Sequence, residues 1–254
     1  MHEYSPSDPR YTAQVLLRIY EELIAHYGPL GWWPSRSGSL WEIMLGAILV
    51  QRTSWKNVEK SLDNIVAAWG LNGLADPNRV IDASESALAE LVRPSGHYNS
   101  KPRKLKNLAH YVENEGGTAA LSVSMRATSD LRRELLAIWG IGPETSDAIL
   151  LYALGRPIFV ADAYALRLAS RWGLLLPTAN YDEIQALFMD NLPHDVALFG
   201  EYHALIVEHG KEICRPQPRC EICPLNRPLS VGVKSCRPVE WQCPKNYVAK
   251  GVRV

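Results

Sequence analysis

Apolar residues spaced three and four positions apart run through almost the whole chain, and this spacing leaves few architectures other than packed helices. The pattern predicts helices over residues 12–28, 40–51, 57–70, 86–96, 131–140, 144–155, 181–193 and 201–214. Several of these runs end at glycine, a common helix stop. Residues 156–164 include a proline near their start and precede a helical pattern, so we interpret them as a linker entering a helix. We therefore expect an all-α protein.

Composition sets wide bounds on what such a chain does. With 254 residues, 47% of them hydrophobic, the chain can bury a substantial core in one or two domains. No apolar run approaches the roughly 20 residues that span a bilayer, and the first residues lack a basic stretch followed by an apolar one. We expect a cytosolic protein with no membrane partner. The net charge of zero argues neither for nor against nucleic acid.

One basic stretch stands out against this neutral background. Between residues 93 and 106 the chain has no acidic residue and five basic ones: Arg93, Lys101, Arg103, Lys104 and Lys106. A solvated loop is one interpretation of the stretch, and a surface that faces DNA phosphates is the other.

The cysteines form one cluster near the end of the chain. All five lie in the last 41 residues, at positions Cys214, Cys220, Cys223, Cys236 and Cys243. In a reducing compartment such a group indicates a metal or cluster site more than a set of disulfides. Four thiolates can hold either an iron–sulfur cluster or a zinc ion, so spacing alone leaves the metal open. Residues 237–254 lack helical periodicity, and we interpret them as an appended tail.

A glycine-rich corner separates two of the expected helices. The first should end near Trp139 and the second begin at Pro143, since proline suits the first position of a helix. Gly140 and Gly142 permit a tight turn whose main-chain N–H groups lie beside a helix N-terminus, which is a favourable place for a phosphate. Many helical hairpins with such a turn bind nothing, so this corner alone does not establish a function.

Four blocks in one order give a resemblance to a known family. "ILVQRTS" at residues 48–54, "GIGPETSDAIL" at 140–150, "FVADAYALRL" at 159–168 and the cysteine cluster resemble the endonuclease III superfamily of DNA glycosylases. The resemblance covers about residues 30–236. It implies a helical barrel over residues 36–156 and a second helical domain made of residues 1–35 and 157–236, with a DNA-binding cleft between them.

The resemblance also implies the partner and its main contacts. Double-stranded DNA with a damaged base would be gripped by the hairpin residues Gly140, Ile141 and Gly142. Gln51 would fill the gap left by the flipped nucleotide, although a surface glutamine at a helix end is the simpler interpretation. We expect the protein to act as a monomer in the cytoplasm of a prokaryote, associated with the nucleoid.

Asp162 takes the catalytic role in this resemblance. Cleavage of an N-glycosidic bond develops positive charge on the deoxyribose, which a nearby carboxylate stabilises. Asp162 also suits the N-cap of the following helix, and the two roles are compatible. Bifunctional members carry a lysine at the position of Glu144, and a carboxylate cannot form their Schiff base. The expected enzyme is therefore a monofunctional glycosylase, and Glu144 complements the helix dipole.

The expected base pocket is aromatic. The segments around Trp32, Trp33, Pro34 and Trp55 resemble the 3-methyladenine DNA glycosylase branch, which lines its pocket with such residues. A cationic alkylated purine is a good leaving group and can be selected by stacking and cation–π attraction. Adjacent tryptophans also serve as core packing, and this alternative stays open. Lys211 aligns with a pocket lysine of the branch, or is a solvated helix-end lysine.

The resemblance favours a structural [4Fe–4S] cluster over zinc. The chain departs from the usual spacing, because the gap between Cys214 and Cys220 is one residue shorter and the gap from Cys223 to Cys236 is much longer. Cys236 is our choice of fourth ligand and Cys243 its competitor. Two other functions remain open: a bifunctional glycosylase and AP lyase acting on oxidised pyrimidines, and an inactive iron–sulfur DNA-binding paralogue.

Overall fold

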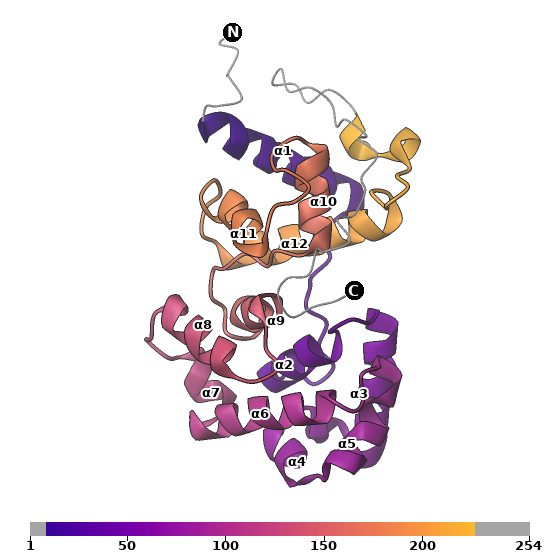
Figure 1. The fold of residues 1–254 in the computed structure, drawn as a ribbon, viewed down its shortest axis with the longest axis vertical. Helices are drawn as coiled ribbons and strands as arrows, with labels where there is room; N and C mark the ends of the chain where they lie inside the picture. The colour runs from indigo at the N-terminus through magenta and orange to yellow at the C-terminus, as the bar shows by residue number, and fades with distance from the viewer. Residues whose placement is uncertain (1–8, 227–254) are drawn as a thin grey trace. The chain divides into compact units, whose positions relative to one another are not determined.

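The computed structural model describes residues 9–226, and all regular structure in this range is helical (Figure 1). The α-helices are α1 (Pro9–Tyr27), α2 (Leu40–Leu49), α3 (Trp55–Trp69), α4 (Pro77–Asp82), α5 (Glu85–Val92), α6 (Lys101–Asn114), α7 (Gly117–Ser122), α8 (Thr128–Ala137), α9 (Pro143–Ala148), α10 (Ala163–Arg171), α11 (Tyr181–Met189) and α12 (Val196–Glu212). The all-α prediction is confirmed for this range.

Shorter helical segments complete the secondary structure of the described range. Four are 3₁₀ turns: η1 (Leu71–Leu74), η2 (Arg93–Ser95), η4 (Cys220–Ile222) and η5 (Pro224–Asn226). The π-helical segment η3 (Ile149–Ala153) directly continues α9. Among these elements, none combines the length and the apolar character that crossing a bilayer requires.

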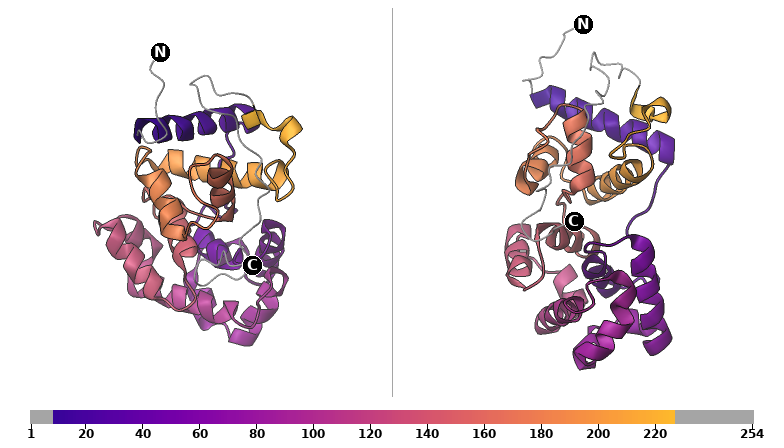
Figure 2. Two further views of the ribbon diagram at one scale, coloured as in Figure 1. Left: turned by 45° about the horizontal axis from the view of Figure 1, so that its top comes forward. Right: turned by 45° about the vertical axis from the view of Figure 1, so that its right-hand side comes forward.

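The described residues divide into two compact units. One unit holds residues 9–32 and 157–226, and the other holds residues 33–156. In the first unit, α1 packs on α12, and α12 packs on α10, as the two views of Figure 2 also show. In the second unit, α2 packs on α3, α6 and η3, while α4 and α5 both lie against α6.

The core of the first unit forms around aromatic residues of α11 and α12. Tyr202 is fully buried and its hydroxyl donates to the carbonyl oxygen of Leu16 at 2.8 Å, which ties α12 to α1. Phe159 stacks on Phe188 with ring centroids 3.8 Å apart. Phe159 lies in the non-helical stretch that leads to Asp162, so this packing fixes the approach to α10.

In the second unit, Glu42 of α2 anchors the segment that follows the tryptophan pair. Its buried carboxylate accepts hydrogen bonds from the main-chain N–H groups of Arg36 and Ser37 and from the hydroxyl of Ser35. Burial by itself raises the pKa of Glu42, but these hydrogen bonds outweigh it and the pKa is lowered. The carboxylate therefore stays ionised at neutral pH and holds residues 35–37 to the start of α2.

The interpretation of residues 93–106 as a solvated loop is wrong for residues 101–106, because α6 begins at Lys101, whereas residues 96–100 do form turns. The side chain of Lys101 is only 1% exposed, and its ammonium donates to the carbonyl oxygens of Leu49 at 2.7 Å and Ser95 at 2.6 Å. Burial, with a smaller contribution from Lys104, lowers the pKa of Lys101 to about 8. Lys101 thus joins the end of α2 to η2 and cannot face a phosphate.

Candidate active site

The expected helical hairpin is present in the second unit. Its second helix begins at Pro143, as predicted, and α8 ends two residues before the predicted Trp139. Gly140 has φ of +98°, in the region that side chains avoid, and the stem of Lys104 lies against its Cα. The N–H of Ile141 donates to the carbonyl of Ile138 at 3.1 Å within the turn. Because the Ile141 N–H is used within the turn, the expected phosphate contact would fall to the main-chain N–H groups of Gly140 and Gly142.

The turn gives a prediction with a matched control in the same loop. In Gly140→Ala, the new Cβ would lie 2.4 Å from Cγ of Lys104 on a backbone with positive φ. We expect a loss of about 1 to 3 kcal/mol in the free energy of unfolding, measured by denaturant titration. Gly142→Ala has nothing within 4 Å of the new Cβ and φ of −101°, so it should be nearly neutral. Equal losses in the two variants would contradict this account.

An exposed aromatic side chain stands beside the turn. Trp139 is 51% exposed, and the guanidinium of Arg103 lies 4.5 Å from its ring centroid. The amide of Asn107 donates to the carbonyl oxygen of Trp139 at 3.3 Å. Arg103 and Asn107 both belong to α6, so this helix supports the hairpin from the side.

Gln51 is held by hydrogen bonds to the hairpin. Its side-chain nitrogen donates to the carbonyl oxygen of Gly140 and to the hydroxyl of Thr145, both at 3.0 Å. Its side-chain oxygen accepts from the ammonium of Lys104 at 2.6 Å. The same amide would have to leave these partners to meet an orphaned base, so its expected role in the DNA gap remains a prediction.

Asp162 lies in the first unit and caps α10. Its Oδ1 accepts the main-chain N–H of Ala165 at 2.8 Å, which confirms the predicted N-cap. The residue is 7% exposed. Its Oδ2 faces Nε2 of His203, 3.6 Å away, on α12. One oxygen is thus fixed by the helix end, while the other faces an imidazole.

Trp32 and Lys211 lie next to this pair within the same unit. The ring of Trp32 stacks on His203 with centroids 5.8 Å apart and planes at 26°. The ammonium of Lys211 is 5.2 Å from the Trp32 ring centroid, and it also pairs with Glu208 at 3.9 Å. Lys211 is exposed, so it combines the solvated position with a contact to a predicted pocket residue. Sequence reasoning missed His203, whose only local signal was its position on a helix leading to the first cysteine.

Trp33 and Trp55 form a second aromatic group, in the other unit. Their ring centroids are 5.2 Å apart at 88°, and Tyr152 of η3 lies 5.4 Å from Trp33. Gly46 of α2 lies so close to the indole that a Cβ there would be 3.1 Å from its Nε1. Pro34 is exposed. The sequence analysis did not single out Tyr152, because nothing in its local pattern separates it from the core residues around it.

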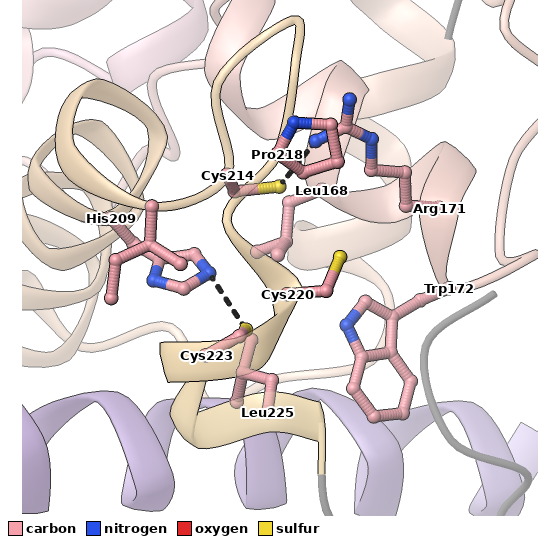
Figure 3. Close-up of a pocket in the computed structure, with 10 residues that line it drawn as sticks. Leu168, Arg171, Trp172, His209, Cys214, Pro218, Cys220, Cys223 and Leu225 are labelled. Carbon is pink, nitrogen blue, oxygen red and sulfur yellow. Dashed lines mark hydrogen bonds between the residues drawn. The ribbon is translucent and has the colours of Figure 1, made fainter. Parts of the chain in front are cut away.

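Cys214, Cys220 and Cys223 line one pocket of the first unit, and Figure 3 shows their sulfurs facing the same space. Arg171 donates to the sulfur of Cys214 at 3.0 Å. Nε2 of His209 lies 3.7 Å from the sulfur of Cys223, and Nδ1 of the same ring is 3.2 Å from the hydroxyl of Tyr27. The remaining lining is largely apolar, with Leu168, Trp172 and Leu225.

The electrostatics of this pocket follow from its burial. Burial, with smaller electrostatic contributions from His26, Arg167 and Arg171, lowers the pKa of His209 to about 4, so the His209 imidazole is neutral at neutral pH. Burial raises the pKa of the Cys223 thiol to about 11. A bound cation is what would keep such a thiol ionised, since metal ligation requires the thiolate.

The pocket fits a group held by thiolates, with a guanidinium beside one sulfur to offset negative charge. Within residues 9–226, no three or more His, Cys, Asp or Glu side chains are arranged as a site for a single metal ion. The predicted fourth ligand, Cys236, its competitor Cys243 and the tail at 237–254 lie outside the described residues.

The Gly-Ile-Gly hairpin and, next in sequence, the aspartate that caps a helix are the features on which the resemblance to helical DNA glycosylases rests. The family model described as HhH-GPD superfamily base excision DNA repair protein matches residues 45–194. The chain is a member of this superfamily. It is a DNA repair glycosylase, an enzyme that hydrolyses N-glycosidic bonds, and its partner is DNA.

Individual relatives support this assignment over most of the chain. A protein of Methanocaldococcus jannaschii, provisionally named a DNA repair glycosylase, is 44% identical over 213 residues, 84% of this chain and 94% of the relative. The structure of the Helicobacter pylori 3-methyladenine DNA glycosylase bound to 1,N6-ethenoadenine has a TM-score of 0.65 and 28% identity, covering 79% of this chain and 97% of that one.

A trapped covalent complex of endonuclease III with DNA shares the fold. Its TM-score is 0.69 at 19% identity, with 84% of this chain and 93% of that chain covered. The similarity at this level concerns architecture alone, so it does not decide between base removal and strand cleavage.

Proposed function

We propose that the protein is a monofunctional DNA glycosylase that removes alkylated purines, chiefly 3-methyladenine, from double-stranded DNA. The observation that carries the substrate class is the aromatic group of Trp33, Trp55 and Tyr152. Such rings offer the π-faces on which a flipped, electron-poor purine stacks. The 28% identical Helicobacter pylori 3-methyladenine DNA glycosylase, whose structure holds 1,N6-ethenoadenine, supports the same class.

The charge beside Trp32 argues against this ring as the one that would receive a cationic base. The ammonium of Lys211 already lies 5.2 Å from the Trp32 ring centroid, and a second cation on that ring would be repelled. The proposal therefore does not assign the base to Trp32.

In this proposal, Asp162 acts at the sugar. As the bond between C1′ and the purine nitrogen breaks, its electron pair leaves with the base and positive charge develops on the deoxyribose. The carboxylate opposes that charge and orients a water molecule, whose oxygen bonds to C1′ and whose proton is released. An N3-alkylated adenine leaves as a neutral molecule, so no strong general acid is required.

Glu144 supports the monofunctional part of the proposal. It occupies the first turn of α9, where it complements the positive end of the helix dipole. A lyase needs an amine that attacks C1′, and a carboxylate lacks the nucleophilic nitrogen for a Schiff base. Lys101, the buried lysine of α6, is committed to two carbonyl oxygens and offers no replacement.

We also propose that Cys214, Cys220, Cys223 and Cys236 hold a [4Fe–4S] cluster with a structural role. The three described thiols line one pocket, and the arginine at Cys214 suits a negatively charged group. When bound, the cluster would supply cross-links between η4 and the end of α12 rather than a reactive centre.

A panel of duplexes, each with one lesion, tests the function. We expect release of 3-methyladenine, with strand breaks seen only after alkaline treatment because the enzyme leaves an abasic site. Borohydride should trap no covalent adduct. Activity confined to uracil or thymine glycol would contradict the pocket assignment, and a trapped adduct would contradict the monofunctional one.

A further inference from the structure

The side chains of Asp162 and His203 face each other in the first unit, and this pairing bears on how the carboxylate is oriented. We propose that His203 is a positioning residue, which directs an N–H at the second oxygen of Asp162 and holds that oxygen in a fixed orientation. The proposal rests on the proposed function, because it presumes that Asp162 acts at the sugar.

The two oxygens of Asp162 have different surroundings. Oδ1 accepts the N–H of Ala165 at 2.8 Å, which holds one end of the carboxylate. The carboxylate could still rotate about this contact and move Oδ2. Oδ2 lies 3.6 Å from Nε2 of His203. This separation is a few tenths of an ångström longer than a normal hydrogen bond between these atoms. A shift of a few tenths of an ångström gives a hydrogen bond that stops the rotation.

The imidazole is held in place by its own neighbours. His203 is 7% exposed on α12. Trp32 stacks on one face of its ring, and Phe159 meets it at 90° with centroids 6.5 Å apart. Phe159 belongs to the non-helical stretch that ends at Asp162. The ring and the carboxylate are therefore positioned by one packed group, which is what a rigid support for a reacting oxygen requires.

A histidine among aromatic rings can also serve only as core packing. The two roles differ in whether the ring N–H is needed, so variants that keep or remove an N–H distinguish them. His203→Phe keeps an aromatic ring for Trp32 and removes the donor. His203→Gln removes the ring and keeps an N–H of similar reach. A packing role predicts that the phenylalanine variant behaves like wild type, whereas the positioning role predicts that the glutamine variant does.

The test measures single-turnover release of 3-methyladenine and, separately, the Kd for a duplex with a stable abasic analogue. In His203→Phe we expect release slower by about 10- to 100-fold, the loss of one charge-assisted hydrogen bond. The Kd for the analogue should change by less than about threefold, because the contact between His203 and Asp162 affects the bond-breaking step and not the binding of DNA. His203→Gln should recover most of the rate. A phenylalanine variant that releases base at the wild-type rate overturns the proposal.

Two further comparisons cover the cases in which His203→Phe does not fold or the protein does not act on the tested lesions. If His203→Phe does not fold, His203→Gln is compared with His203→Met, which has similar length and no N–H; equal rates in these two overturn the proposal. Asp162→Asn is measured alongside. If Asp162→Asn loses base release while His203→Phe keeps the wild-type rate, the positioning role is rejected and the proposed function is still supported. Wild-type protein that releases no base from any lesion removes both.

Discussion

Asp162→Asn is expected to slow base release by at least about a thousandfold while leaving the fold intact. The amide oxygen of asparagine can still accept the N–H of Ala165, so α10 keeps its cap. What is lost is the negative charge that opposes the developing cation on the sugar. Single-turnover release from a duplex with 3-methyladenine measures the effect, and the thermal midpoint checks the fold.

The first unit contains a matched control for this variant. Asp195 caps α12 through the same contact, with its Oδ1 accepting the N–H of Leu198 at 2.7 Å, and it is exposed. Asp195→Asn makes the identical chemical change at another helix start and should release base at the wild-type rate. If Asp162→Asn retains more than about a tenth of wild-type activity, a catalytic carboxylate is the wrong assignment.

Removing a cluster ligand is expected to have the second large effect. Cys220→Ser should abolish the visible absorbance of an iron–sulfur protein and the bound iron and sulfide, because a serine hydroxyl is a poor substitute for a thiolate. Since ligation energy is also folding energy, the thermal midpoint should fall by many degrees. Iron, zinc and acid-labile sulfide per chain are measured on purified wild type and variant.

The same measurements identify the fourth ligand. Cys236→Ser should behave like Cys220→Ser, whereas Cys243→Ser should keep iron and colour and serves as the control. The reverse pattern would move the ligand to Cys243. Zinc alone in the wild-type protein would reject the cluster, without any bearing on Asp162.

Local patterns predicted the features that depend on neighbouring residues. Pro143 marked the start of α9, and Asp162 marked the cap of α10, because both effects operate within one helical turn. Helix α6 was missed for a different reason. Its apolar residues Leu105, Leu108 and Val112 follow the helical spacing, but the basic residues around them were read as one charged stretch.

Contacts between distant residues account for the rest. Lys101 is buried because carbonyl oxygens from α2 and η2 meet at its ammonium, and no pattern around residue 101 indicates this. His203 and His209 were likewise unmarked, since their partners Asp162 and Tyr27 lie on segments brought near only by packing of α10 and α1 on α12. Sequence periodicity finds helices, but it does not find which polar groups they bring together.

The division of the described chain at residues 32–33 and 156–157 has a consequence for synthesis. Residues 33–156 are continuous, so the second unit can complete its core as soon as they leave the ribosome. Helix α1 is made earlier, yet its partner α12 emerges last of the long helices. The apolar stripe of Val15, Leu16, Ile19 and Leu23 must therefore wait in the nascent chain for most of translation.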